Sequence, residues 1–522
     1  MHDLAWWQSA VIYEIYPRSF QDSNGDGIGD LDGIIQRLDY LVKLGVDAIW
    51  VAPIYQSPMG DFGYDVADYC GVDPIFGTMQ DFDRLLEEAH RRDLKVILDF
   101  VPNHSSDQHP WFIESRSSRE NPKRNWYLWR DEPNNWGSNF GGSGWEWDQR
   151  TNQYYYHSFL KEQPDLNWRN PAVRTAMYDA LRFWLDKGVD GFRVDVMWMI
   201  IKDDQYRDNP PNFQYGLGQS SGNSSFLPVY NSNRPEVHGV VAEMRAMIDS
   251  YPGRVLIGEI YLPLNDLMTY YGQELKGANL PFNFLLLKSA WNAQAVAAVI
   301  SDYMNMLPAG AWPNWVLGNH DNPRIATRVG VLQAPIAAML LLTLPGTLTI
   351  YYGEELGMTN VLIPPEDVQD PAEKNQPGIG MGRDPERAPM AWDRSNTAGF
   401  TRGRPWLPLG ADHWAVNVEV EEGNEASVFN LYRRLIALRR AHSVLAVGVV
   451  RSVAVSGNLL SFERAADEER LLIFLNFGHG PVQAVTEAGI VIAGTDSRRN
   501  MERVNNLVEL QGSEGLVIAI TP

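Results

Sequence analysis

Apolar residues recur along the chain in eight short blocks with the length and the β-branched or aromatic content of strands. In the first block, residues 11–16, apolar and polar side chains alternate. The second, residues 46–51, is almost entirely apolar, as is typical of parallel strands buried on both faces. The predicted strands span residues 11–16, 46–51, 95–100, 191–196, 254–259, 279–284, 314–319 and 347–352.

Helical periodicity fills the intervals between these strands. Leucine and isoleucine recur at helical spacing from Leu31 to Leu44, which predicts one amphipathic helix that ends near Gly45. The longest apolar run, residues 334–350, contains Pro345 and Gly346 in its second half, which predicts a buried helix followed by a strand rather than a membrane span. Further helices are expected at residues 81–93, 175–188 and 428–442.

Strands that alternate with helices predict a closed (β/α)8 barrel, whose active site lies at the C-terminal ends of its strands. The interval from residue 101 to residue 190 is much longer than an ordinary connection and indicates a small inserted domain. Long loops at residues 202–238, which contain GQSSGNSS, and 356–404 follow strands and should lie on the catalytic rim. We expect a barrel of residues 1–103 and 171–445, an inserted domain of residues 104–170 and an all-β C-terminal sandwich of residues 446–522.

Composition narrows the classes of ligand. The chain has 522 residues and a formal net charge of −21, which disfavours nucleic acid and anionic membranes as partners. Cys70 is the single cysteine, so an internal disulfide and a cysteine zinc cluster are excluded, and a reducing cytoplasm is favoured. The N-terminal segment lacks a basic start followed by an apolar run, so no secretory signal is predicted. We expect a cytoplasmic protein with a small-molecule ligand; its oligomeric state stays open.

Three predicted strands end in a carboxylate: Asp195 in GFRVDV, Glu259 in VLIGEI and Asp321 in WVLGNHD. Like charges that converge on one barrel mouth are destabilising unless function requires them. A pair of carboxylates, one protonated and one ionised, suits glycoside hydrolysis. Arg193 lies on the same predicted strand face as Asp195 and should keep it ionised, whereas Glu259 has no adjacent cation in the sequence and should have a raised pKa. Asp195 is therefore the expected nucleophile and Glu259 the expected acid/base.

The motifs around these residues resemble the α-amylase family of glycoside hydrolases, and within it the α-glucosidase and oligo-1,6-glucosidase branch. The resemblance rests on five motifs in order over nearly the full length: DFVPNH, QPDLN, GFRVDV, GEIY and GNHD. It implies Asp195 as nucleophile, Glu259 as general acid/base and Asp321 as the carboxylate that holds sugar hydroxyls. It also implies a retaining mechanism through a covalent glucosyl-enzyme and no organic cofactor.

The same resemblance implies contacts to a non-reducing glucose. A carboxylate or guanidinium can form paired hydrogen bonds with neighbouring hydroxyls, and an aromatic ring can cover the apolar face of a sugar. A lone histidine is more often a core residue, but His104 and His320 follow predicted strands beside Asn103 and Asp321. In RDPERAPMAWD the choice between Arg387, which we favour, and Arg383 stays open. The implied contacts are Asp61, Tyr64, His104, Phe140, Arg193, His320 and Arg387.

The segment DSNGDGIGD, residues 22–30, resembles the start of a calcium loop because oxygen-bearing side chains alternate before a glycine. Its twelfth position is Gly33 rather than Glu, unlike an EF-hand, so a solvated acidic turn is the alternative. The family resemblance implies one structural Ca²⁺ or Mg²⁺ with no chemical role. The expected ligands are Asp22, Asn24, Asp26, the carbonyl of Ile28 and Asp30.

Val196, directly after the expected nucleophile, resembles branch members that accept α-1,6 linkages. One aliphatic contact changes discrimination by only about 1–3 kcal/mol, so it biases linkage preference without fixing it. Sucrose, trehalose, isomaltose and maltose remain candidate substrates. A glucosyl-transferring or isomerising relative, of the sucrose isomerase or trehalose synthase type, is the main alternative. A non-catalytic, transporter-associated relative is a weaker one, because all three carboxylates are present.

Overall fold

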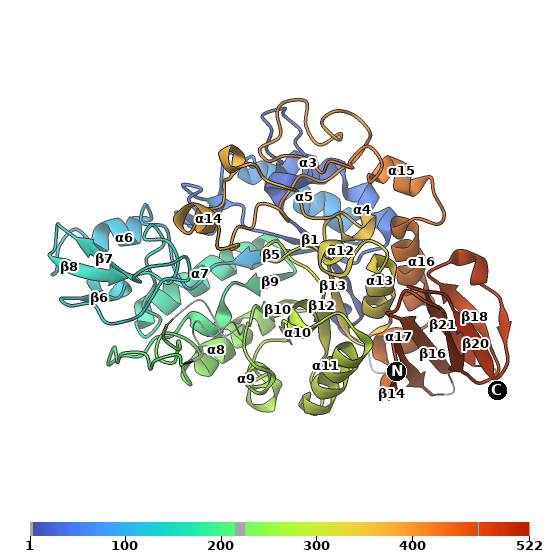
Figure 1. Ribbon diagram of the computed structural model, residues 1–522. Coiled ribbons are helices and arrows are strands. Elements are labelled where there is room, and N and C mark those ends of the chain that lie inside the picture. The colour runs from blue at the N-terminus through green and yellow to red at the C-terminus, as the bar shows by residue number, and fades with distance from the viewer. Residues whose placement is uncertain (1–3, 214–224, 468, 521–522) are drawn as a thin grey trace.

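The computed structural model describes residues 4–213, 225–467 and 469–520, and its centre is an eight-stranded parallel sheet that curls into a barrel (Figure 1). Neighbouring strands follow chain order around the ring, β11-β10-β9-β5-β2-β1-β13-β12. All eight predicted strands are present, and the predicted fold class is confirmed. Their bounds are β1 Val11–Ile15, β2 Ala48–Val51, β5 Lys95–Phe100, β9 Gly191–Val194, β10 Val255–Gly258, β11 Leu280–Pro281, β12 Asn314–Val316 and β13 Thr347–Tyr351.

The barrel is nearly closed, and a side chain completes the ring where β11 and β12 meet. β11 is only two residues long, because Pro281 has no N–H to donate to a neighbouring strand. Asn314 on β12 donates from Nδ2 to the carbonyl of Pro281 at 2.7 Å and accepts the Asn283 N–H at 3.0 Å. One asparagine amide thus replaces the backbone pairing that this last seam lacks.

Helices surround the strands and bury their apolar faces against them (Figure 1). Their ends follow local chemistry: Thr78 and Asp81 form a capping box at the start of α5, and Gly188 ends α7 in the left-handed conformation. The longer helices are α5 Met79–Arg91, α7 Pro171–Lys187, α8 Val237–Asp249, α11 Ala293–Met306, α13 Ala334–Thr343 and α16 Val428–Ala441. The shorter ones include α1 Trp6–Ser9, α2 Pro17–Phe20, α9 Leu264–Thr269, α10 Leu285–Lys288, α12 Ile325–Val329, α14 Pro371–Asn375 and α15 Val418–Glu422.

The single helix predicted from Leu31 to Leu44 is wrong. The segment forms two helices, α3 Leu31–Gln36 and α4 Leu38–Leu44, and Arg37 between them leaves the helical conformation. The Arg37 side chain explains the break, because its Nε donates to Gln21 Oε1 at 2.7 Å and its guanidinium stacks 4.0 Å from the Trp392 ring. The predicted end at Gly45 is confirmed, with φ of 96°.

The apolar run at residues 334–350 is α13 followed by β13, as predicted. In the ranges that the structure describes, no helix is both long and apolar enough to cross a bilayer.

Residues between β5 and α7 form the small antiparallel sheet β6-β8-β7 with α6 Pro110–Ser115 beside it, at the left of Figure 1. Described parts of the loop after β9 pack on this segment: Trp136 Nε1 donates to the Arg207 carbonyl at 2.9 Å. Residues 214–224 of that loop, with most of GQSSGNSS, lie outside the described residues. The strands are β6 Trp129–Arg130, β7 Trp145–Asp148 and β8 Gln153–Tyr156; β3 Tyr55–Gln56 pairs separately with β4 Asp68–Val72.

The C-terminal segment, at the right of Figure 1, forms a six-stranded antiparallel sheet and a two-stranded one. Apolar residues from both sheets, among them Leu459, Ala484 and Val508, share a core. The opposite face of the larger sheet packs on α13, α16 and the short α17 Val444–Val447. The strands are β14 Val449–Ser456, β15 Leu459–Ala466, β16 Glu469–Asn476, β17 Val482–Val485, β18 Gly489–Gly494, β19 Arg503–Val504, β20 Leu507–Leu510 and β21 Gly515–Ile520.

Candidate active site

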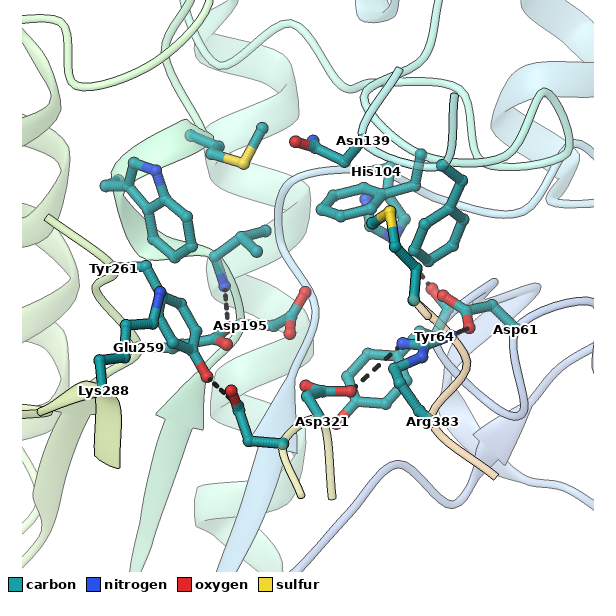
Figure 2. A pocket seen from close by; sticks show the side chains of 17 residues that line it. Asp61, Tyr64, His104, Asn139, Asp195, Glu259, Tyr261, Lys288, Asp321 and Arg383 are labelled. Carbon is teal, nitrogen blue, oxygen red and sulfur yellow. Dashed lines mark hydrogen bonds and ion pairs between the residues drawn. The ribbon is translucent and has the colours of Figure 1, made fainter. Parts of the chain in front are cut away.

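A cavity of about 390 Å³ opens at the C-terminal ends of the barrel strands (Figure 2). The three carboxylates predicted from strand ends, Asp195, Glu259 and Asp321, all line it. Arg193, His320 and Arg387, by contrast, lie behind the wall rather than on it. The sugar contacts expected from the sequence that also line the cavity are Asp61, Tyr64, His104 and Phe140.

Arg193 on β9 binds three carboxylates, one at the end of its own strand and two from the neighbouring strands β5 and β10. Its Nη1 lies 2.8 Å from Asp99 Oδ1 and 2.9 Å from Asp195 Oδ1. Its Nη2 lies 2.8 Å from Glu259 Oε2, and the side chain is fully buried. Register explains the sharing, because Arg193 pairs with Asp99 on β5 and with Ile257 on β10, two residues before Glu259.

This shared guanidinium corrects the expected division between Asp195 and Glu259. We expected Arg193 to act on Asp195 alone, but it compensates both carboxylates. Burial raises the pKa of Asp195 and of Glu259, and Arg193 opposes that shift in each without reversing it. Both carboxyls therefore retain protons to higher pH than free side chains do. Proximity in the sequence to one arginine therefore does not decide which of them is ionised.

The backbone turns sharply directly after Asp195. We expected Val196 to continue the strand on the same face as Phe192, but β9 ends at Val194 and Val196 has φ of 37° and ψ of 45°. This left-handed conformation is strained for a β-branched residue and is found mainly where function requires it. Here it directs the Val196 N–H to Glu259 Oε2 at 2.8 Å and places the Val196 side chain on the cavity wall.

Asp321 lies between two guanidiniums at the other side of the cavity. Arg387 Nη2 approaches Asp321 Oδ1 at 2.7 Å, and Arg383 Nη1 approaches the same oxygen at 3.2 Å. Arg383 also reaches Asp61 Oδ1 at 2.7 Å and Asp370 Oδ1 at 2.9 Å. Burial alone would raise the pKa of Asp321, but His320 and the guanidiniums hold it well below its usual range. Asp321 is therefore ionised at neutral pH.

The structure separates the two arginines between which the sequence left a choice. Arg383 lines the cavity, whereas Arg387 is fully buried and donates from Nε to the His320 carbonyl at 2.8 Å. The preference for Arg387 as the residue that reaches the sugar is not supported by this placement. Arg387 instead binds Asp321 on the side away from the cavity, and the Arg383 guanidinium lies at the cavity wall.

His320 supports Tyr64 rather than facing the cavity. Its Nε2 lies 2.8 Å from the Tyr64 hydroxyl, its Nδ1 lies 2.5 Å from Glu14 Oε1, and its ring stacks on that of Tyr64 with centroids 5.5 Å apart. Burial holds the pKa of His320 well below 6.5, so the ring is neutral at pH 7. The histidine thus fixes the plane of an aromatic ring that lines the cavity.

His104 lines the cavity and is buried, with Nε2 at 3.1 Å from the Tyr64 carbonyl. Burial lowers the pKa of His104 to about 4, so it too is neutral at pH 7. Gln163, from the QPDLN motif, lies with Nε2 at 3.2 Å from Asp61 Oδ2 and 3.1 Å from His104 Nε2. The inserted segment thereby reaches back to fix two residues of the barrel rim.

Several cavity residues were not identified from the sequence as site residues. Tyr261 stands two positions after Glu259, inside the motif GEIY, and Trp198 follows the end of β9, so position alone could have indicated both. Nothing in the sequence near Lys288 or Met381 indicates a site residue, because the segments that carry them come close to the carboxylates only when the barrel has closed. The missed residues are Asn139, Phe159, Trp198, Met199, Tyr261, Lys288, Asn322 and Met381.

The loop of residues 22–30 uses its oxygens as internal acceptors. Asp22 Oδ1 accepts the Asn24 N–H, Asn24 Oδ1 accepts that of Asp26, and Asp26 Oδ1 accepts that of Ile28, each at 2.9 Å. Asp30 caps the start of α3. Within the described part of the chain, no three His, Cys, Asp or Glu side chains converge as a metal site would require. The donor types suit a hard cation, and Asn24 Oδ1 and Asp26 Oδ1, which each accept one hydrogen bond, keep a second lone pair, so metal binding here stays a prediction.

Comparison with known families settles the class of protein. Residues 14–448 match the Alpha-amylase family, described as "Alpha amylase, catalytic domain". The chain belongs to the alpha-amylase family. It is an α-glucosidase-like glycoside hydrolase of that family, so the predicted family and enzyme class are confirmed.

Similar proteins place this alpha-amylase family member among glucosidases. It is 44% identical over 501 residues to a probable alpha-glucosidase of Rhizobium meliloti, covering 91% of this chain and 90% of the relative. It is 41% identical over 515 residues to an oligo-1,6-glucosidase of Parageobacillus thermoglucosidasius, covering 90% of each.

Solved structures of similar proteins extend the range of activities. The alpha-glucosyl transfer enzyme XgtA superposes with a TM-score of 0.94 at 39% identity, over 99% of this chain and all of that one. An inactive double mutant of the trehalulose synthase MutB from Pseudomonas mesoacidophila, in complex with isomaltulose, superposes with a TM-score of 0.90 at 34% identity over 99% of each chain.

Proposed function

We propose that this protein is a retaining, exo-acting α-glucosidase that releases terminal non-reducing glucose from disaccharides and short oligosaccharides. The observation that carries the proposal is that Asp195 and Glu259 face one cavity while bound to the same guanidinium, with Arg193 Nη1 and Nη2 at 2.9 and 2.8 Å. Such sharing keeps the two carboxyls close. It favours the separation of about 5–5.5 Å typical of retaining enzymes over the about 6.5–9.5 Å of inverting ones.

In this proposal Asp195 attacks the anomeric carbon while Glu259 gives its proton to the leaving oxygen. The glycosidic C–O bond breaks, the Asp195 ester forms, and water then displaces Asp195 while Glu259 takes the water's proton back. Position supports the roles: Glu259 lies beside Tyr261, whereas Asp195 lies between Glu259 and the Asp61–Arg383 pair (Figure 2). The raised pKa values of Asp195 and Glu259 allow these two carboxyls to hold the single proton that the first step needs.

Asp321 and Asp61 are the residues that we propose bind the hydroxyls of the terminal glucose. Both are bound to Arg383, at 3.2 and 2.7 Å, which leaves further carboxylate lone pairs for sugar hydroxyls. Tyr64, held by His320, offers an aromatic face to the ring. These connected side chains close one side of the cavity, which supports exo action, because an oligosaccharide cannot extend beyond a terminal glucose that is held against that side.

The roles of the carboxylates are tested by replacing each and offering azide as an external nucleophile. With an aryl α-glucoside, Asp195→Ala and Glu259→Gln should each lower kcat by about 10⁴-fold or more. Azide should then yield β-glucosyl azide from Asp195→Ala, because it attacks in place of the missing carboxylate. It should yield α-glucosyl azide from Glu259→Gln, because it attacks the glucosyl-enzyme.

The matched control is Asp302→Ala, which removes an exposed carboxylate on α11 and should leave turnover unchanged. Substantial activity in either site variant, or β-glucose as the first product of the unchanged enzyme, would overturn the assigned roles.

Glucosyl transfer or isomerisation is the second candidate, supported by the similarity to XgtA and to MutB. It uses the same carboxylates and differs in whether water or a sugar hydroxyl attacks the glucosyl-enzyme. Products from sucrose, trehalose, isomaltose and maltose distinguish the two: free glucose means hydrolysis, and rearranged or elongated sugar means transfer. Val196→Thr in the same panel tests linkage, and we expect the rate ratio of isomaltose to maltose to fall about fivefold.

We also propose that the loop of residues 22–30 binds one structural Ca²⁺ or Mg²⁺ through Asp22, Asn24, Asp26, the Ile28 carbonyl and Asp30. The loop contacts the rim segment near residue 400, where the Asp22 N–H donates to the Phe400 carbonyl at 2.9 Å. Binding there would therefore stabilise the rim without entering the chemistry. Chelation should lower the melting temperature and Ca²⁺ should restore it, whereas Asp26→Ala should abolish the response. An unchanged melting curve after verified metal removal would contradict this proposal.

The substrate class that we propose is a small carbohydrate, with no nucleic-acid or membrane partner. Isomaltulose is bound by the MutB relative, which supports an α-glucoside as the ligand. The cytoplasmic location stays a prediction from the single cysteine, which fractionation of the cell of origin would test.

A further inference from the structure

Lys288 stands at the outer wall of the catalytic cavity. It is the last residue of α10, which follows β11, and it lines the cavity together with Tyr261 (Figure 2). The same two residues also line a second cavity of about 230 Å³, whose other walls include Leu262, Leu267 and Phe284. Lys288 and Tyr261 therefore mark the boundary between the catalytic cavity and an adjoining, mainly apolar one.

Neighbouring residues fix Tyr261 rigidly in this boundary. Its hydroxyl accepts hydrogen bonds from Asn319 Nδ2 and Asn322 Nδ2, each at 3.0 Å. The Phe284 ring stacks on one face, with centroids 4.2 Å apart and planes within 5°. Lys288 Nζ lies 4.3 Å from the Tyr261 centroid, and because Phe284 covers one face, the ammonium occupies the other.

Lys288 differs from the other cation of the cavity wall in its partners. Arg383 is bound to Asp61, Asp321 and Asp370. Among the residues that the structure describes, no carboxylate lies within ion-pair distance of Lys288 Nζ, and Tyr261 supplies its cation–π contact. Burial lowers the pKa of Lys288, and the nearby Glu259 opposes that shift. The ammonium keeps three donors for a ligand.

We propose that Lys288 is a specificity-determining residue of the leaving-group subsite and favours leaving groups that carry an anionic group, a carboxylate or a phosphate. The inference rests on the proposed function, in which Glu259 protonates the leaving oxygen. Glu259, Tyr261 and Lys288 lie on the same side of the cavity (Figure 2), so a leaving group whose oxygen Glu259 protonates would be bound on the side where Lys288 stands. In a protein of net charge −21, a cation at this wall with no carboxylate partner in the described part of the chain offsets the repulsion that an anionic leaving group would meet.

The test compares two aryl α-glucosides that differ in charge, 4-carboxyphenyl α-glucoside and its methyl ester. Their difference in intrinsic leaving ability is the same for every variant and cancels when ratios of kcat/KM are compared. We expect Lys288→Met to lower the carboxylate-to-ester ratio about fivefold, the size of one solvent-accessible ion pair. Lys288→Arg should retain the ratio, and added salt should reduce it in the unchanged enzyme.

Lys276→Met is the matched control, because Lys276 is exposed, is paired with Glu274 and does not line the cavity. Equal losses of kcat/KM on both substrates in Lys288→Met would mean that Lys288 only supports the Tyr261 ring. Unchanged kcat/KM values on both would mean that Lys288 does not contact the leaving group. Either result overturns the inference. If the unchanged enzyme hydrolyses neither aryl glucoside nor any α-linked disaccharide, the proposed function fails instead.

Discussion

Two pairs of arginines, of which only Arg383 is partly exposed, contact different kinds of acceptor in two regions of this molecule. At the catalytic mouth, Arg193 and Arg383 are bound by carboxylates, three on each. Between the barrel and the C-terminal sheets, Arg439 of α16 and Arg464 of β15 are bound by backbone carbonyls. Arg439 donates to the carbonyls of Leu342, Leu344, Gly346 and Leu445, and Arg464 to those of Thr343, Val444, Leu445 and Gly448.

The carbonyls that bind Arg439 and Arg464 come from the end of α13, from the turn before β13, and from α17 and the glycine after it, where several carbonyls have no intrahelical partner. These guanidiniums therefore satisfy orphan acceptors and join the barrel to the C-terminal sheets. Burial lowers the pKa of Arg439 to about 9, and the charge of Asp47 opposes that shift only in part. For Arg193, burial also lowers the pKa, but its carboxylates raise it well above the usual range. A guanidinium bound by carboxylates changes the pKa of those carboxyls, whereas a guanidinium bound by backbone carbonyls stabilises the folded backbone.

The largest effect should come from Arg193→Lys, because one ammonium cannot contact Asp99, Asp195 and Glu259 at once. We expect kcat/KM for an aryl α-glucoside to fall by about 10³-fold or more. The pKa values of Asp195 and Glu259 should rise further as compensation is lost, so the acid limb of the pH profile should move to higher pH. Arg464→Lys is the control and should leave turnover per folded molecule unchanged. An unshifted acid limb in Arg193→Lys would contradict the carboxylate-based role.

A large effect on stability is expected from Arg464→Leu, which removes the donors to four carbonyls. Buried acceptors without partners cost about 1–3 kcal/mol each, partly relieved by relaxation, so we expect a loss of about 3 kcal/mol in the free energy of unfolding. Urea unfolding measures it, with Arg451→Leu on exposed β14 as a control that should change stability by less than about 0.5 kcal/mol. A loss of kcat in the folded Arg464→Leu protein would break the distinction between the two pairs.

The smallest of these effects should come from Arg383→Met. Asp61 and Asp321 would lose a shared partner, but Arg387 would still hold Asp321 at 2.7 Å. We expect kcat/KM to fall about 30-fold, mainly through a higher KM, because the grip on the terminal sugar weakens while Asp195 and Glu259 keep Arg193. A fall in kcat alone would instead assign Arg383 to transition-state stabilisation.

Local sequence patterns were sufficient to predict the features that depend on residues close together along the chain. The barrel strands follow from short apolar, β-branched blocks, and the helix end at Gly45 follows from the conformational freedom of glycine. Asp195, Glu259 and Asp321 could be selected because carboxylates at successive strand ends must meet at one mouth of a barrel. The break at Arg37 was missed because it depends on Gln21 and Trp392, which approach only in the folded chain.

The sequence by itself determined the barrel, the family and the three carboxylates, because repeated strands and short motifs encode them directly. Tertiary structure decided that Arg193 binds Glu259 as well as Asp195 and that Arg383 rather than Arg387 lines the cavity. It also decided that Lys288 lines the cavity with no carboxylate partner among the described residues. The physical reason is that a charge acts on whatever lies within a few ångströms. In a closed barrel those neighbours come from strands and loops far apart along the chain.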